Sequence, residues 1–115
     1  MHITERKTQD VVVLDLEGRL TIGDGAELLR DKVTSVVFQG NSKVLLNLAK
    51  VPYIDSGGLG ELIRCSMAAQ KANGAVKMFG VTGRVVDLLT ITKLITVFDT
   101  FDTEQEALSS FMATA

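Results

Sequence analysis

The chain has 115 residues, 46% of them hydrophobic, with 12 Lys and Arg residues against 14 Asp and Glu residues, one His and one Cys. This length suits a single domain over residues 1–115, and a formal net charge of −2 without a basic stripe argues against direct binding to nucleic acid or to an anionic membrane. One Cys excludes an internal disulfide and, with one His, a usual Cys/His zinc site; no apolar run is long enough to cross a bilayer. We therefore expect a soluble, cytoplasmic protein without a bound metal.

The N-terminal third of the chain predicts a hairpin followed by a helix. Val11–Glu17 is a β-branched run that shifts into alternation, and a shorter strand over residues 3–8 can pair with it as a hairpin. From Gly25 onward apolar residues recur at helical spacing, and Gly40 supplies the C-terminal stop. The buried face of this amphipathic helix is expected to comprise Ala26, Leu29, Val33 and Val36.

A second strand and helix follow. Residues 43–48 form an apolar run that is too continuous for a strand with one wet face, as in a central parallel strand. A helix is predicted from near Ser56 to the Asn73-Gly74 pair. The expected inward positions are Leu59, Leu62, Ile63 and Met67, and the expected outward positions are Glu61, Arg64 and Lys71.

The C-terminal part predicts two further strands and two helices. A strand over residues 76–80, a short helix around residues 85–89 and a last strand over residues 95–98 precede a closing helix over residues 104–112. The closing helix is expected to bury Ala107, Leu108 and Phe111. This order predicts an α/β fold: an open, mixed, mostly parallel β-sheet with an antiparallel N-terminal strand and about four α-helices packed against it.

The sequence offers little for catalysis. His2 is the only imidazole, so no Ser/His/Asp or Cys/His arrangement can be assembled, and Asp55 has no evident second carboxylate beside it. The glycine clusters before the two long helices, around Asp24 and around Leu59, lack the Lys-Ser/Thr pair of a Walker loop and the spacing of a dinucleotide fingerprint. We therefore expect no enzymatic activity and no cofactor.

The most informative segment is residues 51–60, which lies between a buried strand and an amphipathic helix, where ligands meet α/β sheets. Ser56 is expected at or near the N-cap, with Asp55 favoured by the helix dipole. Capping does not explain three glycines in four positions, since each interior glycine costs roughly 0.5 to 1 kcal/mol relative to Ala. The glycines suggest close approach by another group, and they leave the Ser56 hydroxyl accessible to a kinase.

This segment carries a family resemblance. The Asp55-Ser56-Gly57-Gly58-Leu59-Gly60 turn, following Leu46-Asn47-Leu48 and Tyr53-Ile54, resembles the signature of the STAS domain, specifically of bacterial anti-sigma factor antagonists. The passages from Gly18-Arg19-Leu20 to Ala26-Glu27-Leu28 and from Gly74 to Val76-Lys77-Met78 extend the resemblance over nearly the whole chain. Gly57 stands where the family more often carries Ser or Ala, so Ser56 is the only hydroxyl in this turn.

The resemblance implies a single STAS domain that acts by partner switching. The unphosphorylated protein would bind an anti-sigma factor that is also a serine kinase and so release a sigma factor. Phosphorylation at Ser56 would abolish this binding, and a serine phosphatase would restore it. Phosphate at a helix N-terminus is well tolerated, so we expect the domain not to refold on modification.

A contact surface for the partner is expected around the Ser56 turn. It comprises Asp24, Asp55, Ser56, Gly57, Gly58, Leu59, Glu61 and Arg64. Asp24 is alternatively an N-cap of the first helix, and Tyr53 either packs under the loop or contacts the partner. Two other functions stay open: a constitutive STAS scaffold that uses the same loop without phosphorylation, and a module of a bacterial signalling complex that senses a nucleotide or other small ligand.

Overall fold

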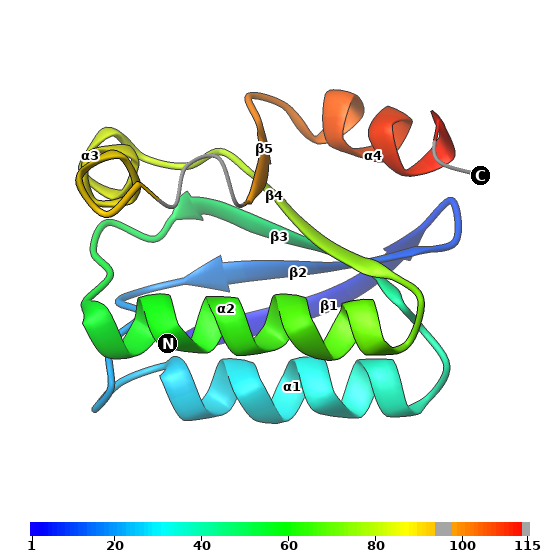
Figure 1. Cartoon of the computed structure of the whole chain (residues 1–115), viewed down its shortest axis with the longest axis horizontal. Coiled ribbons are helices and arrows are strands. Elements are labelled where there is room, and N and C mark those ends of the chain that lie inside the picture. Colours follow the sequence, from blue (N-terminus) through cyan, green and yellow to red (C-terminus); the bar gives the residue numbers. More distant parts are fainter. Residues whose placement is uncertain (94–97, 114–115) are drawn as a thin grey trace.

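The computed structural model describes residues 1–93 and 98–113, which form the α/β fold of Figure 1. The strands are β1 (His2–Thr8), β2 (Val11–Glu17), β3 (Lys43–Lys50), β4 (Ala75–Phe79) and β5 (Asp99–Phe101). The helices are α1 (Ala26–Phe38), α2 (Ser56–Lys71), α3 (Gly83–Ile91) and α4 (Glu104–Ala113).

The five strands form one sheet in the order β1-β2-β3-β4-β5. β1 pairs antiparallel with β2, and the remaining neighbours are parallel. Gln9 and Asp10 both take positive φ, 52° and 69°, as a tight two-residue hairpin loop requires. The predicted mixed sheet with an antiparallel N-terminal strand is confirmed, and so is the predicted hairpin.

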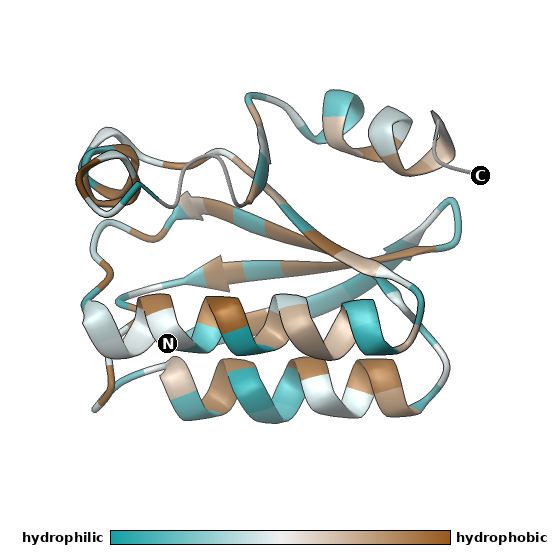
Figure 2. Ribbon diagram, viewed as in Figure 1, coloured by the Kyte–Doolittle hydropathy of each residue, from teal (hydrophilic) through white to brown (hydrophobic). Residues whose placement is uncertain are grey.

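Helices cover both faces of the sheet (Figure 1). α1 and α2 lie side by side on one face, α4 lies on the other, and α3 lies near the ends of β3 and β4. The strands β2 and β3 are largely hydrophobic along their length because both of their faces are covered (Figure 2). Alternation divides their side chains: Val12, Leu14 and Leu16 enter the core under α1 and α2, whereas Val11 and Val13 enter the core under α4.

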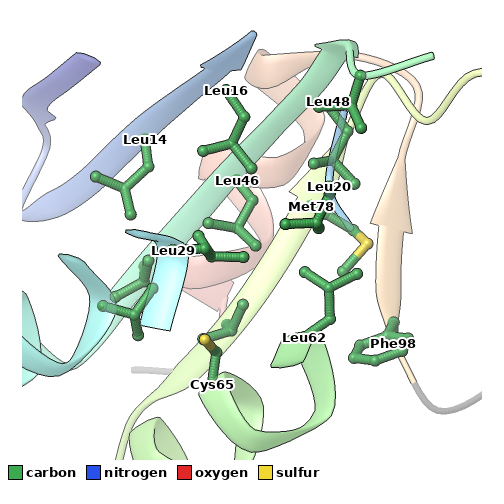
Figure 3. Packing of buried hydrophobic residues seen from close by; sticks show 14 of the residues in the cluster. Leu14, Leu16, Leu20, Leu29, Leu46, Leu48, Leu62, Cys65, Met78 and Phe98 are labelled. Atoms are coloured by element: carbon green, nitrogen blue, oxygen red, sulfur yellow. The ribbon is translucent and has the colours of Figure 1, made fainter. Parts of the chain in front are cut away.

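The larger core joins side chains from three strands and both long helices. Leu14, Leu46 and Met78 from the sheet are fully buried and face Leu29 of α1 and Leu62 of α2 (Figure 3). The smaller core contains Ala107, Leu108 and Phe111, the three inward positions predicted for the closing helix.

Two side-chain orientations predicted for α2 are wrong. Glu61, expected to face outward, is only 3% exposed, whereas Met67, expected to face inward, is 52% exposed. The reason is that α2 packs against α1 as well as against the sheet, so its buried arc is rotated toward α1. The strand predicted over residues 95–98 falls mostly outside the described residues; the described strand in this region is β5, which begins at Asp99.

Two loops at the carboxyl edge of the sheet bring the N-termini of α1 and α2 together. The loop after β2 and the loop after β3 are joined by a parallel bridge between Leu20 and Ile54. The amide of Leu20 donates to the carbonyl of Tyr53 at 3.0 Å, and the amide of Asp55 donates to the carbonyl of Leu20 at 3.3 Å.

Within residues 1–93 and 98–113, none of the helices has the length and hydropathy needed to cross a membrane.

Candidate functional site

Asp55 organises the N-terminus of α2. Its Oδ1 accepts a hydrogen bond from the amide of Gly58 at 2.8 Å, and its Oδ2 accepts one from the amide of Ile22 at 3.2 Å. These bonds, chiefly the one from Gly58, hold the pKa of the Asp55 carboxyl below its ordinary value. One carboxylate therefore caps α2 and also fixes the loop that leads into α1.

Ser56 is the first residue of α2, and its side chain is exposed. Ser56 lies next to the N-cap, within the expected position, but the N-cap itself is Asp55, and the capping hydrogen bond is made by the Asp55 side chain and not by the Ser56 hydroxyl. Since the capping bonds are made by Asp55, they do not depend on the Ser56 hydroxyl, which stands at the positive end of the helix dipole.

The glycines after Ser56 differ in whether the surrounding structure leaves room for a side chain. A β-carbon at Gly57 would lie 2.6 Å from the Cβ of Ile22, and one at Gly58 would lie 2.1 Å from the carbonyl oxygen of Leu20. The close approach that the sequence predicted is therefore made by the chain's own β2–α1 loop. Gly60 is different, because a β-carbon there would meet only the Nη1 atom of Arg64, at 3.8 Å.

Asp24 lies beside this site but does not cap α1. The N-cap of α1 is Gly25, and within residues 1–93 and 98–113 no side chain makes a capping hydrogen bond there, so the capping expectation for Asp24 is wrong. Instead, Asp24 Oδ1 accepts a hydrogen bond from the amino group of Met1 at 2.9 Å, with the Asp24 side chain 51% exposed. Asp24 thus lies at the same edge of the sheet as Ser56, with its carboxylate open to solvent on one side.

Glu61 of α2 has a buried side chain on the side of the helix near α1. Glu61 Oε2 accepts a hydrogen bond from Arg64 Nη1 at 3.2 Å. Glu61 Oε1 is buried and has no hydrogen-bond partner among the described residues. Glu61 therefore sits beneath Arg64 and positions it, whereas the Arg64 side chain itself is 69% exposed.

A groove of about 570 Å³ runs between the N-terminal parts of α1 and α2. It is lined by Ser56, Gly57, Gly60, Glu61 and Arg64 on one side and by Ile22, Ala26, Glu27 and Arg30 on the other. Sequence reasoning missed Ile22 and Arg30. Ile22 is 79% exposed although it is a large hydrophobic residue, and the signal for it is its place next to Gly23 in a predicted loop.

Leu59 and Tyr53 differ in how far they can contact a partner. Leu59 is buried, so its side chain belongs to the core below the turn. Tyr53 is 37% exposed, and the Arg19 guanidinium lies over its ring, 5.3 Å from the centroid. The Tyr53 ring is therefore held by a cation–π contact at the surface and is not packed beneath the loop.

The described residues contain no group of three or more acidic, His or Cys side chains that could hold a metal ion. Cys65 is buried, and burial raises the pKa of its thiol to about 12. It is therefore a neutral thiol within the α2 core face at physiological pH.

Comparisons with known proteins give a matching family model and a similar protein. The family model of the STAS domain matches residues 2–107. The anti-sigma-B factor antagonist of Bacillus subtilis (strain 168) is 24% identical over 99 residues, which are 86% of this chain and 89% of that protein.

Solved structures share the fold. A candidate anti-sigma factor antagonist from Thermotoga maritima is 25% identical, with a TM-score of 0.89 over 96% of this chain and 94% of that chain. The Bacillus protein SpoIIAA matches in its unphosphorylated form (22% identity, 95% of this chain and 96% of that chain) and in its phosphorylated form (21% identity, 95% and 98%). The TM-score is 0.72 for both forms, a likeness in fold that does not depend on the phosphate.

Proposed function

The chain belongs to the STAS domain family, and from this membership and the geometry of Ser56 we propose that it is an anti-sigma factor antagonist that acts by partner switching. The unphosphorylated form binds an anti-sigma factor with serine kinase activity, and the sigma factor is released. Phosphorylation of Ser56 abolishes this binding, and a serine phosphatase restores it. The protein itself is a binding protein and supplies no catalysis.

The observation that carries this proposal is the exposed Ser56 side chain at the first position of α2. A kinase needs an accessible hydroxyl, and Ser56 is not needed for capping because Asp55 makes the capping bond. Phosphorylation would take the formal net charge from −2 to roughly −4. The helix dipole favours this added charge, so the protein keeps its fold and the effect falls on the contact with the partner.

The proposed contact surface surrounds Ser56. Asp24 and Arg64 offer exposed charged side chains, and Gly57 offers accessible backbone beside Ser56. Asp55, Gly58 and Leu59 shape the turn from within, and Glu61 holds Arg64 from below. A doubly charged phosphate brought against a partner surface must lose its water, which costs several kcal/mol unless the partner offers cations, so binding falls.

The test is intact-mass spectrometry after incubation with ATP and each kinase-type anti-sigma factor from the same genome, followed by a pull-down of the same pairs. Ser56→Ala removes the proposed acceptor. Ser109→Ala is the matched control, because Ser109 is also an exposed helical serine but lies on α4, on the other side of the sheet.

We expect one phosphate on the wild type and on Ser109→Ala, none on Ser56→Ala, and weaker capture of the phosphorylated form. Capture by an anti-sigma factor without phosphate transfer from any candidate would instead indicate the constitutive scaffold.

A further inference from the structure

We propose that the groove between α1 and α2 is a receptor for the phosphate of this chain's own phospho-Ser56, with Arg64 of α2 and Arg30 of α1 as its cationic walls. This inference rests on the proposed phosphorylation of Ser56 and goes beyond it, since it states where the phosphate lies once it is attached. The ligand class is a phosphate monoester dianion supplied in cis.

The position of Arg64 follows from the spacing along α2. Ser56, Gly60 and Arg64 are four residues apart in turn, so they lie above one another on one face of the helix. A β-carbon at Gly60 would be 3.8 Å from Arg64 Nη1, so the guanidinium lies over Gly60, one helical turn from Ser56. The absence of a side chain at Gly60 leaves open the path from the guanidinium to a phosphate on Ser56.

Arg64 has hydrogen-bond donors to spare. Among the described residues it donates one hydrogen bond, from Nη1 to Oε2 of Glu61, out of the five N–H groups of a guanidinium. Glu61 is 3% exposed and its Oε1 has no hydrogen-bond partner in the described part of the chain, so the pair is not the two-point contact that would occupy Arg64 fully. Arg64 can therefore keep Glu61 and bind a phosphate oxygen at the same time.

Arg30 faces the same groove from α1 and is loosely held. Its nearest carboxylate contacts are to Glu27 and Asp31, each at 3.8 Å, which is longer than a hydrogen bond. Its side chain is half exposed and lines the groove together with Ser56 and Arg64. A phosphate between the two arginines would link the two helices.

The charges around the groove show why cations are needed there. Glu27 and Glu61 line it, so a phosphate dianion without nearby cations would face two carboxylates. The two guanidinium groups offset this repulsion and favour a phosphate that lies in the groove. The groove would then be occupied by the phosphate and closed to a partner's side chain.

The experiment uses the full chain with phosphoserine incorporated at position 56 during translation, so that neither kinase nor partner is needed. The second pKa of the phosphate is measured by ³¹P NMR titration. A solvated phosphoserine has a second pKa of about 6. A neighbouring guanidinium favours the dianion, so we expect a value lower by about one unit in the wild-type background.

Arg64→Gln and Arg30→Gln are each expected to return the phosphate pKa toward that of solvated phosphoserine. Lys71→Gln is the matched control, because it removes one positive charge from the opposite end of the same helix and should leave the value unchanged. A lowered pKa that Arg64→Gln leaves intact would overturn the receptor and assign the shift to the helix N-terminus alone. A second pKa near 6 in all four proteins would also overturn it. Failure of the kinase assay would refute the proposed switch without touching this result.

Discussion

Gly58 and Gly60, two residues apart on α2, differ in the space that the rest of the chain leaves for a side chain. A β-carbon at Gly58 would overlap the Leu20 carbonyl oxygen at 2.1 Å, which is backbone and cannot move aside without breaking the Leu20–Ile54 bridge. We expect Gly58→Ala to lower the free energy of unfolding by at least ~2 kcal/mol. A β-carbon at Gly60 meets only Arg64 Nη1, at an ordinary van der Waals distance of 3.8 Å, so Gly60→Ala should raise the free energy of unfolding by ~0.5 to 1 kcal/mol, the usual gain of replacing Gly by Ala within a helix.

Urea denaturation of the two variants beside the wild type measures both changes. The pair is a matched test, because the same methyl group is added twice to the same helix. Equal effects at the two positions would contradict the close approach of the β2–α1 loop to Gly58.

The residues of the site differ in how far the sequence could predict them. The Asp55-Ser56 turn was predicted from its glycines and its place after a buried strand, and the helix does begin there. The sequence did not decide whether Asp55 or Ser56 is the N-cap, because a shift of one residue in the helix start exchanges the N-cap and the first helical position. The contacts of Ile22 with Gly57 and of Asp24 with Met1 join residues more than 20 positions apart, and local patterns carry no information on such pairs.

At the scale of elements, α4 is tied to the first two strands by Arg6 of β1. The Arg6 Nε donates to Asp15 Oδ2 at 2.7 Å, and its Nη1 donates to Glu104 Oε2 at 3.1 Å. These bonds hold the pKa values of the Asp15 and Glu104 carboxyls below their ordinary values. Because the folded-state pKa values are lowered, the tie contributes stability above the ordinary carboxyl pKa and loses it as pH falls through the lowered values.

We expect Arg6→Gln to speed the hydrogen exchange of the α4 amides by about threefold or more at neutral pH, while α1 and α2 keep their rates. The size is modest because all three side chains are partly exposed. Lys7→Gln, one residue along on the other face of β1, is the control. Unchanged exchange in α4 would show that the apolar contacts of Ala107, Leu108 and Phe111 suffice to hold the helix.

For α2, the sequence predicted the helix but not all of the side chains that it buries. Its period of apolar residues predicted a helix with Leu59 and Leu62 inside, and both are buried. The sequence alone could not say that α1 would pack alongside, and this neighbour covers Glu61 and leaves Met67 at the surface. The strands were easier, because alternation in Val11–Glu17 assigns each side chain to one of two faces whatever packs there.

At the scale of the whole molecule, the question is whether phosphorylation changes the fold or only its surface. The Asp55 carboxylate bonds to Gly58 and Ile22, and the Leu20 backbone packs against Gly58, so the turn around Ser56 is fixed from below. A phosphate at this helix N-terminus gains something like 0.3 to 1 kcal/mol from the dipole and needs no rearrangement of the sheet. We therefore expect the phosphorylated chain to retain its core packing.

¹H–¹⁵N correlation spectra of the chain with phosphoserine at position 56, compared with the unmodified chain, test this expectation. Changes should be confined to the β2–α1 loop and to the N-terminal parts of α1 and α2, as far as Arg30 and Arg64, with the amides of β3, β4 and α4 unmoved. Phosphoserine at position 109 is the control and should shift α4 alone. Chemical-shift changes that spread from position 56 through β3 and β4 into α4 would mean that the partner recognises a new conformation. Chemical-shift changes that stay local would mean that the partner responds to the added charge and to the occupied groove.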